Sequence, residues 1–160
     1  MIRLKNRADW DTQMTIPGSA AVVTAAGAGR DVLFAPFNGW IAAIWATFAI
    51  NGVDGTGAPT QNVVVDILQN GTSIFASGNA NKINWLHTAL AKTPTSYGVL
   101  SADPVSVSAG DTFEAQILQI LNGTTPTQPI SLVVGMLFSR KEQSPVANTD
   151  FGDYLAANYA

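Results

Sequence analysis

The chain of 160 residues contains no cysteine, which excludes disulfide bonds, thiolate nucleophiles and cysteine-ligated zinc. Histidine occurs once, at His87 in the stretch NWLHT, so a catalytic triad or a zinc site would depend on that one side chain. The adjacent Trp85 and Leu86 favour a structural role for it, and no His-x-x-Glu or His-Glu-x-x-His spacing occurs. We therefore expect no metal, no cofactor and no catalytic residue.

Long hydrophobic runs are also absent. The longest, residues 40–50 (WIAAIWATFAI), is well short of the roughly 18 residues that a membrane-spanning helix needs. The N-terminal stretch MIRLKNRADWDTQ has charges but no apolar stretch after them of the kind found in signal peptides. We expect neither a membrane segment nor a signal peptide.

Charge is scarce and unevenly placed. Charged residues make up 12% of the chain and the net charge is −3, so the basic surface that nucleic-acid binding requires is missing. Only nine charged residues lie between positions 12 and 139, far below the quarter or so that is usual, and the other ten lie in the two ends. Two interpretations stay open: a surface that faces other proteins, or one rich in Thr, Ser, Asn and Gln.

What the chain does contain is a series of short segments rich in β-branched and aromatic residues, separated by Gly, Pro and Asn. In NVVVDILQ, Val63, Val65 and Ile67 share one strand face, and Phe113, Ala115 and Ile117 do so in TFEAQILQIL. The pattern predicts one all-β domain of about eight antiparallel strands. Candidate strands are residues 20–24, 31–37, 40–51, 61–69, 72–76, 98–100, 104–107, 112–121 and 130–139.

Two turns are predicted by their residue types. Asn70-Gly71 fits a two-residue hairpin turn with positive φ at both positions, so segments 61–69 and 72–76 should pair antiparallel. Ala109-Gly110-Asp111 predicts a second turn. Residues 79–90 are the one stretch of the body that could be helical, because Ile83, Leu86 and Leu90 have helical spacing.

The two ends differ from the body, and we divide the chain into an N-terminal arm (1–13), a β-sandwich domain (14–140) and a C-terminal arm (141–160). Each arm has aromatic or charged residues but too few apolar ones for a core of its own. It could lie over its own domain or dock on a neighbouring subunit, and we favour docking. The candidate interface residues are Arg3, Lys5, Arg7, Trp10, Phe151, Tyr154, Leu155 and Tyr159.

Other chemistry receives little support. Asp66 and Glu114 are expected on outward strand faces as possible cross-strand neighbours, and a carboxylate pair is what glycoside hydrolysis needs. Solvated surface carboxylates are the ordinary explanation. The loop 51–57 has one acid, which is less than a calcium loop usually supplies. A sugar platform could draw on Trp40, Trp45, Phe48 and Trp85, but Trp40 and Trp45 point to opposite faces unless a bulge intervenes.

The succession FNGWIAAIWATFAING, NVVVDILQNGTSIFA, VSVSAGDTFEAQILQI and ISLVVGMLFSR, over residues 32–140, resembles the jelly-roll modules in structural proteins of tailed bacteriophages. In those modules a G-x-I strand precedes one ending in NGT-x-I, and V-x-A-G-D opens a later long strand. The matching residues are turn and core positions: Gly39, Ile41, Asn70, Gly71, Thr72, Ile74, Val107, Ala109, Gly110 and Asp111.

The resemblance is strongest to capsid decoration (cement) proteins, because a short chain with two arms lacks the long shaft of a fibre. It implies a single jelly-roll β-sandwich without enzymatic activity, made in the host cytoplasm and bound to the outer capsid surface of the virion. The implied partners are the major capsid protein and further copies of the chain, in a homotrimer, with no direct contact to nucleic acid or membrane. The alternative is a tail-fibre or host-attachment module that binds glycans.

Overall fold

The computed structural model of the chain describes residues 10–15, 27–50, 62–85, 95–121, 128 and 130–145. These ranges hold ten β-strands and one turn of 3-10 helix, η1 (Asn79–Asn81), and the predicted all-β class is confirmed. The strands are β1 (Trp10–Thr15), β2 (Gly27–Phe34), β3 (Gly39–Ile50), β4 (Val63–Gln69), β5 (Thr72–Ser73), β6 (Ile83–Trp85), β7 (Thr95–Ser96), β8 (Ser106–Val107), β9 (Thr112–Gln119) and β10 (Ile130–Ser139). Three of them, β1, β6 and β7, were not predicted. The predicted strand at 98–100 is wrong, since only Leu100 forms an isolated bridge, with Phe75, and the predicted strand at 20–24 lies outside the described ranges.

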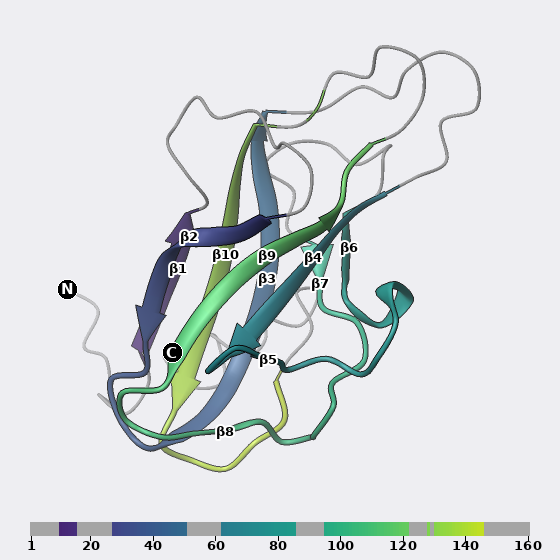
Figure 1. Cartoon of the computed structure of the whole chain (residues 1–160). Helices are drawn as coiled ribbons and strands as arrows, with labels where there is room; N and C mark the ends of the chain where they lie inside the picture. Colours follow the sequence, from purple (N-terminus) through teal and green to yellow (C-terminus); the bar gives the residue numbers. More distant parts are fainter. Residues whose placement is uncertain are drawn as a thin grey trace, which may run out of the picture.

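The strands form two antiparallel sheets that lie in two layers (Figure 1). Sheet A has the order β1-β10-β3-β7, and β8 also pairs with β3. Sheet B has the order β2-β9-β4-β5, and β6 also pairs with β4. Figure 1 shows β2, β9 and β4 in front of β10 and β3. In the part of the chain that is described neither sheet closes on itself, so the architecture is an open two-layer β-sandwich.

The core lies between the two sheets and follows the predicted alternation. In β4 the side chains of Val63, Val65 and Ile67 are fully buried, and β9 contributes Phe113 and Ala115 in the same way. Sheet A supplies the opposing layer with the buried side chains Ile41, Ile44, Ala46, Phe48, Leu132, Val134, Met136 and Phe138. Burial of this apolar surface is the main driving force for the fold.

A β-bulge in β3 changes the direction of its side chains. Leu137 of β10 pairs with Ala43, whereas the next residue, Phe138, pairs with Ile41, so Ala42 is the extra residue. Because side chains alternate along a strand, one extra residue reverses which positions face the core. Ile41 therefore faces the core before the bulge and Ile44 after it.

Both predicted turns are confirmed. Asn70 and Gly71 have φ angles of 52° and 80°, and β4 and β5 on either side of them pair antiparallel. Gly110, with φ of 88°, lies in the turn between β8 and β9. Positive φ is strained for side chains other than Gly, Asn and Asp, which explains why these residue types occupy the turns.

The predicted helix at 79–90 is wrong over Ile83–Trp85, which is strand β6. Val63, Val64 and Val65 of β4 pair with Trp85, Asn84 and Ile83. The open edge of β4 offers backbone hydrogen bonds here, and Ile83 and Trp85 both reach the core from the extended conformation.

Strand β1 crosses the predicted boundary at residue 13, and Trp10 at its start lies opposite Phe138 of β10. Residues 10–13 thus extend sheet A. Of the predicted C-terminal arm, residues 141–145 are described, and the Tyr97 hydroxyl donates a hydrogen bond to the carbonyl oxygen of Pro145. No helix among the described residues is long and apolar enough to cross a membrane.

Candidate functional site

The predicted arm residues fall mostly outside the described ranges. Of the eight candidates only Trp10 is described, as the first residue of β1. The seven that lie outside are Arg3, Lys5, Arg7, Phe151, Tyr154, Leu155 and Tyr159. The predicted docking of the arms therefore stays a prediction, and a candidate site has to be sought on the two sheets.

An exposed apolar pair lies on β2, which is an edge strand of sheet B. Val32 and Phe34 pair with Glu114 and Thr112 of β9, and their side chains are 47% and 63% exposed. Leu33 between them packs against the core, so Val32 and Phe34 point outward from the sandwich. A large aromatic exposed to this extent on a sheet edge is a candidate contact surface.

The described surface of the body carries little charge. Two of the body's nine charges, Asp66 and Lys82, are buried in an ion pair. Over the described side chains between residues 32 and 139, the charges left at the surface are three carboxylates, those of Asp103, Asp111 and Glu114. Because Lys82 is buried, the described surface is poorer in charge than the composition indicated.

The buried pair belongs to a three-residue network at the edge of β4. Lys82 Nζ lies 2.8 Å from Asp66 Oδ2 and donates a hydrogen bond of 2.8 Å to Ser73 Oγ. The Ser73 hydroxyl in turn donates to Asp66 Oδ1 at 2.7 Å and accepts a hydrogen bond from the backbone N–H of Phe75. The network joins β4 to both short strands on that edge, β5 through Ser73 and β6 through Lys82, which directly precedes it.

These positions correct the expectation for Asp66 and Glu114. Asp66 does lie on the outward face of β4, but its side chain is only 6% exposed because Lys82 and Ser73 cover it. Directly across from Asp66 is Gln116, and Glu114 lies across from Leu68. The carboxylate of Asp66 is bound to an ammonium group instead of facing a second carboxylate, which is the arrangement of a structural clamp.

The bulge at Ala42 is the case that the sequence left open for Trp40 and Trp45. Both now project from the outward face of sheet A, and both are half-buried. Trp45 packs on a small cluster formed by Ala42, Ala43 and Leu137, separate from the main core. The two indoles therefore share one face of the protein, which a regular strand would not allow.

The other two aromatics considered for a sugar platform lie in the core, where a ligand cannot reach them. Phe48 and Trp85 are fully buried and pack edge to face with ring centroids 4.9 Å apart. The indole Nε1 of Trp85 has no hydrogen-bond partner. These rings are core residues that join sheet A to sheet B.

Asp111 organises the turns at one end of the sandwich. Its carboxylate accepts hydrogen bonds from the Ser108 backbone N–H (2.8 Å), from Asn70 Nδ2 (2.8 Å) and from Gln69 Nε2 (2.7 Å). The Ser108 bond, followed by those from Asn70 and Gln69, lowers the pKa of Asp111, against a smaller opposing effect of burial. The Asp111 carboxylate thus binds the backbone of its own turn, and it also ties that turn to the β4–β5 hairpin.

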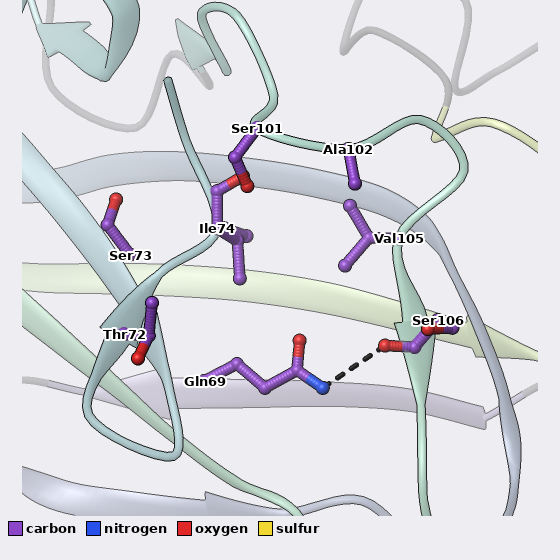
Figure 2. A pocket seen from close by; sticks show the side chains of 8 residues that line it. All are labelled: Gln69, Thr72, Ser73, Ile74, Ser101, Ala102, Val105 and Ser106. Carbon is purple, nitrogen blue, oxygen red and sulfur yellow. Dashed lines mark hydrogen bonds between the residues drawn. The ribbon is translucent and has the colours of Figure 1, made fainter. Parts of the chain in front are cut away.

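A groove opens beside this network, between the β4–β5 hairpin and the segment that leads into β8 (Figure 2). Its volume is about 240 Å³. Figure 2 shows Ile74 and Val105 on opposite sides of the groove, with the Gln69 side chain below them and its nitrogen bonded to the carbonyl oxygen of Ser106. The lining residues are Gln69, Thr72, Ser73, Ile74, Ser101, Ala102, Val105 and Ser106.

Nothing in the described ranges forms a metal site, since no three His, Asp or Glu side chains gather there. His87 and the loop 51–57, the candidate metal-binding positions in the sequence, lie outside those ranges. Sequence reasoning missed the Lys82–Ser73–Asp66 network, because residues 79–90 were considered as a possible helix. The two-residue alternation of Lys82, Ile83, Asn84 and Trp85 is the pattern that could have revealed a strand.

Searches with the sequence and the structure match no protein family, no curated protein and no solved structure.

Proposed function

We propose that this chain is a virion structural protein, a jelly-roll decoration (cement) protein that binds the outer surface of a capsid as a homotrimer and stabilises the shell through contacts between subunits. The observation that carries the proposal is the pair Val32 and Phe34, exposed on an edge strand of a body whose described surface has so little charge. Surfaces of this kind are typical of proteins that bury them against other protein.

The strand order supports the jelly-roll part of the proposal. Two short strands, β5 and β6, share one edge of β4, and two more, β7 and β8, share one edge of β3. When each of these pairs is counted as one interrupted strand, the sandwich has eight strands in two sheets of four. Each strand is then followed in the chain by a strand of the other sheet, except that β4 is followed by β5 in the same sheet. The last strand, β10, lies between β1 and β3. Two interlocked Greek keys of this kind make a jelly roll.

The residues that carry the phage resemblance occupy positions consistent with it. Gly39 and Val107 pair where β8 meets β3, and a side-chain hydrogen bond joins Asn70 to Asp111. They hold together one end of the sandwich. Turn and core positions of this kind are evidence for the jelly-roll architecture. The proposed role in the virion depends instead on the exposed, charge-poor surface.

Co-sedimentation with assembled capsids tests the proposal. We expect the chain to pellet with capsids that lack a decoration protein and to raise the temperature at which those capsids lose their contents. The Phe34→Ser variant should bind more weakly, whereas Val99→Ser, which replaces a residue of similar exposure (56%), should bind as the unaltered chain does. A chain that stays in the supernatant contradicts the proposal.

Glycan binding by a host-attachment module is the second candidate, and the bulge at Ala42 is the observation that favours it. Trp40 and Trp45 share the outward face of sheet A, and the accessible part of each half-buried indole offers a flat apolar surface to a sugar ring. Tryptophan fluorescence titrated with a glycan panel tests this candidate. A saturable change that is lost in Trp40→Ala would support it, and an unchanged spectrum with every glycan would exclude it.

A further inference from the structure

The groove beside the β4–β5 hairpin has the features of a small binding site. Ile74 and Val105, both at least 95% buried, are the apolar residues on its two sides, and Thr72, Ser101 and Ser106 add hydroxyl groups to its lining. The Ser73 hydroxyl is turned to the other face, where it binds Asp66 and Lys82. A few polar groups placed among apolar side chains are typical of ligand sites.

Gln69 supplies this groove with a hydrogen-bond acceptor of fixed orientation. Its Nε2 atom donates both of its hydrogens, one to the Ser106 carbonyl oxygen at 3.1 Å and one to Asp111 Oδ2 at 2.7 Å. A carbonyl and a carboxylate can only accept, so the amide cannot be flipped. Figure 2 shows the Oε1 atom directed upward, into the space between Ile74 and Val105. A ligand in this space has to offer an O–H or N–H group to Oε1.

The size and charge of the groove restrict the ligand further. A volume of about 240 Å³ is below the roughly 300 to 1,000 Å³ of pockets that enclose drug-sized molecules. None of the eight lining residues is ionisable, and the charge directly behind Gln69 is the carboxylate of Asp111. Hydrogen bonds from three donors stabilise that charge, so it repels an anion throughout the neutral range.

We infer that the groove binds one ring of a neutral sugar, which donates a hydroxyl hydrogen to Gln69 Oε1 and places its C–H face on Ile74 and Val105. The wall hydroxyls of Thr72 and Ser106 can donate to and accept from the remaining hydroxyls of the ring. This site lies on different elements from Trp40 and Trp45, and it does not depend on whether the chain binds a capsid.

The test is an NMR titration of the isotope-labelled full chain with methyl glucoside, methyl galactoside, methyl mannoside and methyl N-acetylglucosaminide, each neutral, and with methyl glucuronide as the anionic counterpart. At least one neutral glycoside should shift the backbone amide signals of Thr72, Ser101 and Val105 saturably. The glucuronide should bind at least about tenfold more weakly, which corresponds to about 1.4 kcal/mol.

Two variants separate this site from others. Ala102→Trp places a large side chain in the groove and should abolish the shifts, because Ala102 lines the groove and is exposed. Ala80→Trp, at an exposed alanine of η1 outside the groove, should leave them unchanged. Three results would each overturn the inference: no shift at the groove amides with any neutral glycoside, shifts that persist in Ala102→Trp, or equal affinity for the glucuronide.

Discussion

The indole ring of Trp45 lies over Gly135, the residue directly across from it on β10. A Cβ atom added to Gly135 would overlap the ring atoms Cε2, Cζ2 and Nε1. The missing side chain of Gly135 thus makes the space in which the indole lies flat on the outward face of sheet A. This contact, together with the bulge at Ala42, gives that face its aromatic surface.

Replacing Gly135 by alanine should therefore displace Trp45. We expect Gly135→Ala to lower the free energy of unfolding by about 1 to 3 kcal/mol, the usual cost of overpacking, and to shift the tryptophan emission. Urea unfolding monitored by circular dichroism measures the first effect, and fluorescence measures the second.

The double variant Gly135→Ala with Trp45→Ala is the control. Once the indole is removed, the added methyl group has nothing to overlap, so Gly135→Ala should cost much less in the Trp45→Ala background than in the unaltered chain. If Gly135→Ala lowers the free energy of unfolding equally in the two backgrounds, the position of the Trp45 ring does not depend on the missing side chain of Gly135.

Removing one partner of the buried ion pair should destabilise the fold strongly. Lys82→Met leaves the Asp66 carboxylate buried without a counter-ion, and we expect a loss of about 3 to 5 kcal/mol in the free energy of unfolding. Ser73→Ala removes a bridging hydroxyl but leaves the ion pair, so its cost should be smaller, about 1 to 3 kcal/mol.

The double variant Asp66→Leu with Lys82→Met tests the physical reason. With neither charge present no group is left uncompensated, so this protein should be more stable than Lys82→Met alone. If the double variant is less stable than Lys82→Met, the network stabilises the fold by more than the mutual neutralisation of two buried charges.

Acid should remove the contribution that the ionised Asp111 carboxylate makes to the stability of the fold. Its pKa is lowered in the folded state by the hydrogen bonds from Ser108, Asn70 and Gln69, so the folded protein holds the ionised form more firmly than the unfolded chain does. The resulting stability is present above the unfolded pKa, about 3.9, and is lost as the pH falls through the lower folded pKa. The stability difference between the unaltered chain and Asp111→Asn should be constant near neutrality and shrink below about pH 4. A difference that does not change between neutral pH and the acid range would contradict this role.

The sequence was informative where local chemistry decides the structure. Asn70-Gly71 and Gly110 predicted their turns because few residues accept positive φ, and Val63, Val65 and Ile67 predicted a core face because burial follows a two-residue period. Strand β6 was missed because its extended conformation depends on pairing with Val63–Val65, about twenty residues earlier in the chain. Such long-range pairing leaves little trace in a short segment.

The candidate sites were harder to predict for the same reason. The shared face of Trp40 and Trp45 depends on a bulge whose extra residue, Ala42, is an ordinary alanine in an apolar run. The burial of Asp66 depends on Lys82, which follows it by sixteen residues, and on Ser73. The fixed orientation of Gln69 requires Asp111, forty-two residues away. Each site is assembled by contacts between strands. The spacing of residues along a single strand does not predict such contacts.

The central claim, that this chain functions by assembly through its exposed surfaces, is tested most directly by the solution mass of the full chain, measured by light scattering beside Phe34→Ser and Val99→Ser. The account predicts a mass three times that of one chain for the unaltered protein and for Val99→Ser, and a smaller mass for Phe34→Ser, because Phe34 lies on the proposed contact edge and Val99 does not. A single-chain mass for the unaltered protein at all concentrations would contradict it.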